Sequence, residues 1–314
     1  QVQVDGNEPF EFKKENKDSS IPVTGLTPGY HTVTIEGFDI TDLSPLVQIY
    51  SANQFWVRVC PNLKSLFGLN GLDSVSTYFI IEFNDSLEDL TDLDNLNYVG
   101  SVFEISNNPR LEIIDGFSGF NLYENELIIK ENISLTSIIG FQNLEYSNGI
   151  ISIWDNPLLN NLVGFENLKT IKNLSLGGLN IIDLTPFSLL DSINYLELSC
   201  PNPAFSFDGL ENLVSLGQLH LSDIVITDFS PLQSIIELNS LTIDNCSNID
   251  NLLFLSQINY LSGNITISNN QGLLKLNGLH NIDSIIGYLN VSNNALQTLS
   301  AFNNIISVGN NLTI

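Results

Sequence analysis

The sequence predicts a β-rich solenoid, a parallel β-helix of about 12–13 rungs of 22–24 residues with occasional short helical turns. Three observations support this fold class. From residue 31 onward, short segments alternate apolar and polar residues, as strands with one buried face do. Each segment is followed by Ser, Asn or Asp, then by L-x-x-L and G-[LF]-x-N-L. The pattern returns at a nearly constant spacing, which is the signature of stacked repeats.

The last inward apolar residue of each alternating segment defines the expected register. These marks lie 22–24 residues apart, so we count thirteen marks and twelve complete rungs. A segment such as 265–267 cannot shield its own inward pair, so neighbouring rungs must shield each other and form one parallel sheet. The marks are Ile35, Val59, Phe83, Ile105, Ile129, Ile153, Leu176, Leu198, Leu221, Ile243, Ile267, Val291 and Ile314.

The bends between segments are of two kinds. Residues 42–45, 183–186 and 228–231 share D-[LF]-[ST]-P, and Ser or Thr before Pro predicts an N-cap followed by one helical turn. Other rungs carry a glycine at the equivalent bend, where a positive φ or close packing is expected. These glycines are Gly68, Gly116, Gly140, Gly164, Gly209 and Gly278.

The composition suits a large core and excludes several partners. Of 314 residues, 43% are hydrophobic and 14% charged, which excludes wholesale disorder. Ten Lys and Arg stand against 35 Asp and Glu, so the formal net charge is −25. This charge would repel nucleic acid and an anionic membrane surface, and no apolar run is long enough to cross a bilayer. We therefore expect no nucleic-acid partner and no direct membrane insertion.

The stretch from Ile267 to Ile285 resembles I-S-N-N-x-x-L-x-x-L-x-G-L-x-x-L-x-x-I, the repeat of leucine-rich-repeat proteins and more closely of receptor L domains. The resemblance covers about residues 31–314. It implies a leucine-rich-repeat-like receptor L-domain solenoid, although the cysteine-rich modules and terminal disulfides of eukaryotic receptor L domains are missing. The Asn/Ile/Ser-rich, Lys-poor composition resembles bacterial surface and secreted repeat proteins of Bacteroidetes type. The resemblance thus implies an extracellular or cell-surface location, and the lack of Met, even at position 1, agrees with removal of a signal peptide or excision from a longer chain.

The two ends differ from the middle of the chain. Residues 1–30 do not fit the repeat, so we expect an N-terminal cap there and the solenoid over 31–314. Alternatively, residues 25–34 resemble the closing strand of an Ig-like module, and 1–30 would be its remnant. The last strand, 311–314, has no closing rung, so we expect another module or subunit to cover the uncapped end at Ile314.

A binding site is expected on the outward face of the sheet. The middle outward residue of each rung should form one column that includes Arg58, Glu82 and Glu104, with both Trp residues beside it. Exposed aromatic and Arg side chains are typical anchors, whereas a solvated face is the alternative reading for any single residue. Trp56, Arg58 and Trp154 mark the preferred patch. The full set of candidate binding residues is Trp56, Arg58, Glu82, Glu104, Trp154, Tyr195, His220 and Tyr288.

No catalytic, cofactor or metal site is expected. His31, His220 and His280 are far apart in the repeat, so no catalytic triad or metal cluster assembles. The three cysteines have neither disulfide nor zinc spacing and are predicted to be small buried side chains. The Asn pairs 269/293 and 270/294 fall in equivalent turns and predict a hydrogen-bonded Asn ladder rather than calcium ligands. The cysteines are Cys60, Cys200 and Cys246.

Two short patterns are candidate glycosylation signals. Seven N-x-[ST] sequons occur, although chance explains them in an Asn/Ser-rich chain. Four D-S-[LIV] triplets resemble the O-glycosylation signal of Bacteroidetes, although the repeat itself also explains two of them. The candidate residues are Asn84, Asn132, Asn173, Asn245, Asn264, Asn290, Asn311, Ser74, Ser86, Ser192 and Ser284.

Three classes of function are compatible with these features. The first is a non-enzymatic extracellular recognition or adhesion module that binds a protein or glycan through the sheet face. The second is a structural strut or accessory subunit of a cell-surface assembly. The third is ice binding through the ladder Thr242, Thr266, Asn290 and Thr313, but this ladder is short and the rest of its column is charged or bulky. The sequence favours the first class.

Overall fold

The computed structural model describes residues 2–4, 32–88, 90–226 and 228–314. They belong to two compact units, unit 1 (Gln1–Asn167) and unit 2 (Leu168–Ile314). Both units are parallel β-solenoid with short 3-10 turns and no α-helix among the described residues, which confirms the predicted fold class. Leaving aside the antiparallel first strand, six described strands in unit 1 and seven in unit 2 follow the main path, one for each of the thirteen marks.

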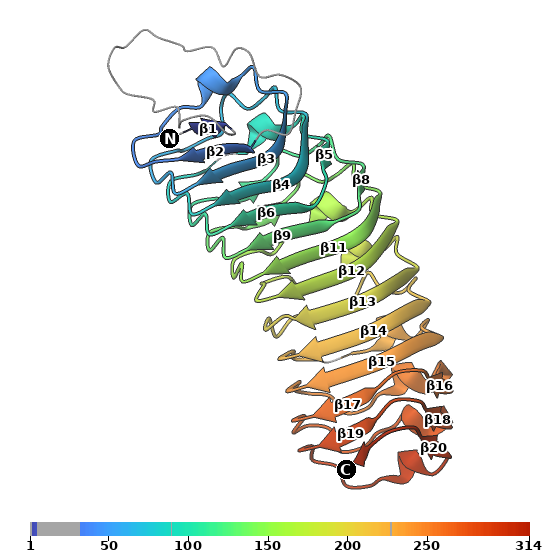
Figure 1. The fold of residues 1–314 in the computed structure, drawn as a ribbon. Coiled ribbons are helices and arrows are strands. Elements are labelled where there is room, and N and C mark those ends of the chain that lie inside the picture. Colours follow the sequence, from blue (N-terminus) through green and yellow to red (C-terminus); the bar gives the residue numbers. More distant parts are fainter. Residues whose placement is uncertain (1, 5–31, 89, 227) are drawn as a thin grey trace. The chain divides into compact units, whose positions relative to one another are not determined.

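In unit 1 the main strands stack in chain order, as the blue-to-green part of Figure 1 shows. Two further pairings extend this stack at the start of the strands. Strand β5 (Tyr98–Val99) pairs with β4 (Ser74–Glu82), and β8 (Leu122–Tyr123) pairs with β11 (Tyr146–Trp154). A separate ladder joins β7 (Ile113–Ile114) to β10 (Ser137–Ile138). The main strands are β2 (Thr32–Glu36), β3 (Ser51–Arg58), β4 (Ser74–Glu82), β6 (Val102–Ser106), β9 (Glu126–Lys130) and β11 (Tyr146–Trp154).

Strand β1 (Val2–Val4) pairs antiparallel with β2 and thus covers the outer edge of that strand. Antiparallel addition at a sheet edge satisfies backbone groups that an open edge would leave unpaired. Residues 5–31 lie outside the described part of the chain, so the cap over 1–30 and the Ig-like alternative stay predictions.

Unit 2 repeats the same construction. Ile243, Ile267 and Val291 lie in direct register on three neighbouring strands, which confirms the predicted stacking of these inward residues. A second parallel ladder is formed by β16 (Tyr260–Leu261), β18 (Ser284–Ile285) and β20 (Ser307–Val308). The main strands are β12 (Thr170–Gly177), β13 (Ser192–Ser199), β14 (Ser215–Ser222), β15 (Glu237–Asp244), β17 (Ile265–Ser268), β19 (Leu289–Ser292) and β21 (Leu312–Thr313).

Two of the predicted register marks are wrong. Ile35 pairs with Val57 rather than Val59, and Val57 pairs with Ile81 rather than Phe83. Val59 and Phe83 follow the ends of their strands with φ angles of 51° and 56°, and both are exposed. The apolar alternation continues to these positions, but the left-handed backbone has already turned the chain out of the sheet.

The three D-[LF]-[ST]-P segments form the predicted single turns, namely the 3-10 turns η1 (Ser44–Leu46), η4 (Thr185–Phe187) and η5 (Ser230–Leu232). The predicted cap is wrong, however, because the Asp two residues earlier accepts the free backbone N–H. Ser230 N donates to Asp228 Oδ1 at 2.8 Å, and Ser230 Oγ donates to Asp228 Oδ2 at 2.6 Å. These two bonds hold the pKa of Asp228 below its usual value. The remaining turns are η2 (Thr91–Leu93), η3 (Val163–Phe165), η6 (Leu253–Gln257), η7 (Leu279–Asn281) and η8 (Ser300–Phe302).

The bend glycines behave as expected. Gly278 has a φ of 115°, and a Cβ there would lie 1.8 Å from the Leu252 carbonyl oxygen of the preceding rung. Gly116 has no positive φ, but a Cβ would approach the Leu90 oxygen to 1.9 Å. Both kinds of bend therefore depend on the close approach of two backbones, which only glycine permits.

A buried Asn ladder runs along the turns that follow the strands. In unit 1 the Oδ1 atom of each Asn accepts the backbone N–H of the ladder residue one rung before it, at 2.9–3.2 Å. In unit 2, Asn270 and Asn294 continue this arrangement, which confirms the predicted pair. Asn269 and Asn293 are instead exposed residues with positive φ, so that pair is not part of the ladder. The unit 1 ladder consists of Asn84, Asn108, Asn132 and Asn156.

Cys60 and Cys246 occupy the ladder position one rung earlier in each unit. Their backbone N–H groups donate to Asn84 and Asn270, at 3.1 and 2.9 Å. With Cys200 they are free, buried thiols, as predicted. Burial raises the pKa of Cys60 and Cys246 to about 11 and that of Cys200 to about 12.

Candidate functional site

The outward face of the unit 1 sheet is a grid of three columns, because each strand from β2 to β11 presents three outward residues in register. The first column is Thr32, Gln54, Tyr78, Val102, Glu126 and Ile150. The middle column is Thr34, Trp56, Ile80, Glu104, Ile128 and Ser152. The third column is Glu36, Arg58, Glu82, Ser106, Lys130 and Trp154.

This register corrects the predicted columns. Arg58 and Glu82 lie in the third column rather than the middle one, and Trp56 lies in the middle column rather than beside it. The cause is the misplaced marks at Val59 and Phe83, which shifted two strands by two residues. Trp56 therefore shares its column with Ile80, Glu104 and Ile128.

We name eight of these residues the unit 1 patch. They span β3 to β11 and comprise both Trp residues of the chain, two isoleucines, two basic and two acidic side chains. Both indoles are half-exposed, Trp56 in the middle column and Trp154 in the third. The unit 1 patch is Trp56, Arg58, Ile80, Glu82, Glu104, Ile128, Lys130 and Trp154.

Arg58 joins the aromatic and the charged parts of the patch. Its guanidinium carbon lies 5.1 Å from the centroid of the Trp56 ring, and its Nε donates to Glu36 Oε2 at 3.0 Å. A guanidinium over an indole face is a favourable cation–π geometry. Arg58 is thus held by two contacts on its own face of the sheet.

Lys130 and Glu104 form a second ion pair, with Nζ and Oε1 3.1 Å apart. Glu82 is different, because no described side chain forms an ion pair or a hydrogen bond with its carboxylate. Burial, and then the nearby Glu104 carboxylate, raise the pKa of Glu82, although Arg58 and Lys130 act against this. The patch therefore contains one partly desolvated carboxylate without a paired cation.

The outward face of unit 2 has another chemical character. Its strands present mainly hydroxyl and amide side chains, including Gln218, Ser240, Thr242 and Thr266. No Trp and no outward Ile occurs on these strands. A polar face of this kind keeps its hydration and offers few anchors for a protein partner.

Within this face Tyr195, Glu197 and His220 form one small cluster. Glu197 accepts a hydrogen bond from Ser175 Oγ at 2.7 Å, and its other oxygen lies 3.5 Å from His220 Nδ1. Tyr195 Oη lies 3.4 Å from the same nitrogen, and burial raises the pKa of Tyr195 to about 12. Tyr288 is not part of the cluster, since β14, β15 and β17 lie between its rung and β13.

The structure separates the candidate glycosylation sites into two groups. Asn84 and Asn132 are fully buried ladder residues whose Nδ2 atoms donate to Val57 O and Ile105 O, both at 3.0 Å. A glycan on either nitrogen would break the ladder, so these two candidates are wrong for the folded chain. The other candidate sites are half-buried or exposed and stay predictions. They are Asn173, Asn245, Asn264, Asn290, Asn311, Ser74, Ser86, Ser192 and Ser284.

The described residues contain no group of three or more His, Cys, Asp or Glu side chains that could hold a metal ion. His220 lies on β14 and His280 in η7, whereas His31 lies outside the described residues. None of the described helices has the length and apolar character needed to cross a bilayer.

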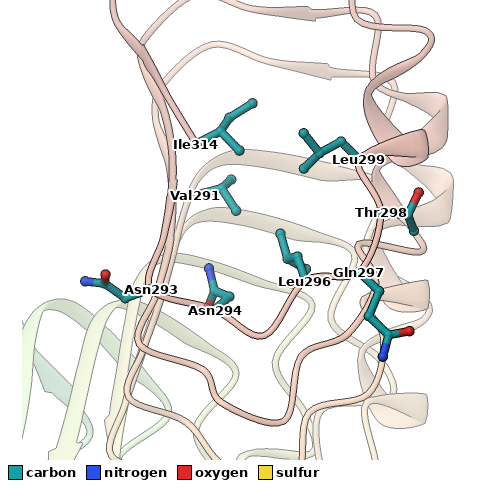
Figure 2. A pocket seen from close by; sticks show the side chains of 8 residues that line it. All are labelled: Val291, Asn293, Asn294, Leu296, Gln297, Thr298, Leu299 and Ile314. Atoms are coloured by element: carbon teal, nitrogen blue, oxygen red, sulfur yellow. The ribbon is translucent and has the colours of Figure 1, made fainter.

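The last rungs of unit 2 expose an apolar layer. Figure 2 shows Val291, Leu296, Leu299 and Ile314 lining an open hollow, with polar side chains at its rim. The exposed fractions of Leu299 and Ile314 are 45% and 56%, so about half of each of these two side chains is open to solvent. That another module or subunit covers it remains a prediction.

Comparison with solved structures finds distant similarities. One solved structure is the TLR13–ssRNA13 complex, with a TM-score of 0.41 and 16% identity. The similarity covers 81% of this chain but only 44% of the length of the TLR13 chain. Another is the internalin InlF of Listeria monocytogenes str. 4b F2365, with a TM-score of 0.34 and 16% identity over 88% of this chain and 90% of that chain. No protein-family model matches the sequence, and no curated protein matches it.

Proposed function

We propose that this chain is a non-enzymatic recognition module that binds a protein partner through the unit 1 patch. One observation carries the proposal: both Trp residues of the chain lie on the same outward sheet face, together with Ile80 and Ile128. Large aromatic side chains and Arg supply most of the binding free energy at protein interfaces. As part of this proposal the chain acts outside the cell or at its surface, because its Asn/Ile/Ser-rich, Lys-poor composition resembles that of bacterial surface and secreted repeat proteins.

The sheet makes these side chains suitable anchors. Trp56 and Trp154 extend from strands that are hydrogen-bonded to their neighbours within unit 1. The backbone beneath them is ordered before a partner arrives, so binding costs little additional conformational entropy. The ion pairs of Arg58 and Lys130 surround the apolar positions and resemble the polar rim of a protein interface.

The test is a selection of random peptides displayed on phage against the wild-type chain, followed by affinity measurements on the enriched peptides. The double variant Trp56→Ala, Trp154→Ala should lose at least about tenfold in affinity, since two aromatic anchors are removed. Its melting temperature should stay close to that of the wild type, because both side chains point away from the core.

Phe67→Ala is the matched control, because Phe67 is an aromatic side chain of unit 1 that is 62% exposed and lies outside the strands. This variant should bind the enriched peptides like the wild type. Equal affinity of the double Trp variant and the wild type would refute the proposal, as would binding only to immobilised glycans.

A structural strut is the second candidate, and the apolar layer around Leu299 and Ile314 favours it. Such a strut would associate through this layer rather than through the sheet face. Analytical ultracentrifugation of the variant Ile314→Asp tests this candidate. Self-association that Ile314→Asp abolishes and the Trp variants leave unchanged would support the strut.

A further inference from the structure

We propose that the protein partner of the unit 1 patch is basic, and that one of its Lys or Arg side chains pairs with Glu82. This inference rests on the proposed function and specifies the chemistry of the partner. It follows from the way in which charges are paired on this face, from the surroundings of Glu82, and from the charge of the whole chain.

Within the unit 1 patch, the charge pairing leaves one acidic side chain without a cation. Arg58 is engaged by Glu36 and the Trp56 ring, and Lys130 is engaged by Glu104. Glu82 lies beside Arg58 in the third column but shares no ion pair with it in the described part of the chain. The unit 1 patch thus presents one carboxylate that is still available to a cation from outside.

The surroundings of Glu82 make this carboxylate sensitive to what covers it. On its own strand it is next but one to Ile80, whose side chain is 9% exposed, and on the next strand its register partner is the buried Ser106. A partner that seals the face would remove the remaining water from Glu82. Burying an unpaired carboxylate costs free energy, so an apolar or acidic partner is disfavoured and a cationic one is favoured.

The neighbouring side chains suit a long cationic residue. The apolar stem of Lys or Arg can lie along the half-exposed Trp56 ring while its charged end reaches Glu82. Moreover, a net charge of −25 attracts basic partners over a distance and repels a second copy of this chain. A face-to-face homodimer is therefore disfavoured as the occupant.

The probes are short synthetic peptides in which leucine alternates with lysine, with glutamine or with glutamate. Binding is read from the intrinsic fluorescence of Trp56 and Trp154, which are the two Trp residues of the chain. We expect the lysine peptide to bind more tightly than the glutamine peptide, and the glutamate peptide to bind least. Glu82→Gln should lower the affinity for the lysine peptide about fivefold and leave the affinity for the glutamine peptide unchanged.

Glu166→Gln is the matched control for non-specific attraction. It removes the same charge from an exposed residue of unit 1 that caps η3 and lies outside the sheet. It should change the affinity for the lysine peptide less than about twofold, because an exposed distant charge is screened. The inference would be overturned if Glu82→Gln and Glu166→Gln lost the same affinity for the lysine peptide. It would also be overturned if the wild type bound the lysine and glutamine peptides equally well, or did not bind the lysine peptide.

The outcomes also separate this inference from the proposed function. Peptide binding that requires Trp56 and Trp154 but not Glu82 would leave the recognition face in place and overturn only the basic partner. Peptide binding measured by calorimetry that is unchanged in the double Trp variant would contradict the proposed function itself. The wild type could also self-associate, with Glu82→Gln strengthening the association and the Trp variants abolishing it. That result would identify a second copy of the chain as the occupant and overturn the inference of a basic partner.

Discussion

The side-chain oxygen of Asn108 accepts two hydrogen bonds from Asn84, one from its backbone N at 3.2 Å and one from its Nδ2 at 3.1 Å. Both residues are fully buried in unit 1. Asn108 in turn donates through its own Nδ2 to Ile81 O at 3.0 Å and to Ser106 O at 2.9 Å. One amide side chain therefore satisfies polar groups of two successive rungs and fixes their spacing.

Asn108→Ala should lower the free energy of unfolding by about 3 kcal/mol, because it leaves buried donors and acceptors without partners. Urea denaturation followed by circular dichroism measures this loss. Asn143→Ala is the control, since Asn143 Nδ2 donates to Ser118 O at 2.8 Å but is exposed. It should cost less than about 1 kcal/mol, because water replaces the lost bond. Similar losses in both variants would contradict the ladder's structural role.

Gly209→Ala should destabilise unit 2. Gly209 has a φ of 103°, and a Cβ there would lie 2.3 Å from the carbonyl carbon and oxygen of Leu184. Backbone strain and overlap should together cost about 2–4 kcal/mol and lower the melting temperature. Gly272→Ala is the control, because its Cβ would have no neighbour closer than 3.5 Å. It should leave the melting temperature nearly unchanged, and a loss equal to that of Gly209→Ala would refute this account of the bend.

The three thiols should resist thiol–disulfide exchange in the folded chain. Burial raises the pKa of Cys60, Cys200 and Cys246 to between about 11 and 12, so at pH 8 nearly all of each is the unreactive thiol. Reaction with an aromatic disulfide reagent at pH 8 should be slow in buffer and complete in denaturant. A thiol that reacts as fast in buffer as in denaturant would show that its site is open.

Glu82→Gln should raise the free energy of unfolding at pH 7 by less than about 1 kcal/mol. The pKa of Glu82 is raised in the folded chain, so folding favours the protonated carboxyl. Stability from this group is therefore present below the unfolded pKa, about 4.3, and is lost as the pH rises through the higher folded pKa. The gain from Glu82→Gln should be larger at pH 7 than at pH 4. Thermal unfolding at both values measures it, and a larger gain at pH 4 would contradict the shift.

The candidate site was only partly predictable from the sequence. The alternation identified Trp56 and Trp154 as outward residues, since neighbouring positions on a strand point to opposite faces. Arg58 and Glu82 were predicted as neighbours in one column, as they are, but in the middle column with Glu104 rather than in the third. The error arose because apolar Val59 and Phe83 prolong the alternation beyond the strand ends. The Asp caps were missed for a similar reason, since Ser and Thr before Pro carry the same local signal as an N-cap.

The sequence by itself determined the period, the parallel stacking and the column of inward residues, because a strand with two apolar side chains can hide them only against the next rung. The tertiary structure alone decided the column in which Arg58 and Glu82 lie, which carboxylate of the unit 1 patch lacks a cation and that Asn84 and Asn132 are buried. These depend on the residue at which each strand ends, and the left-handed turns at Val59 and Phe83 set that point through backbone geometry rather than through hydrophobicity.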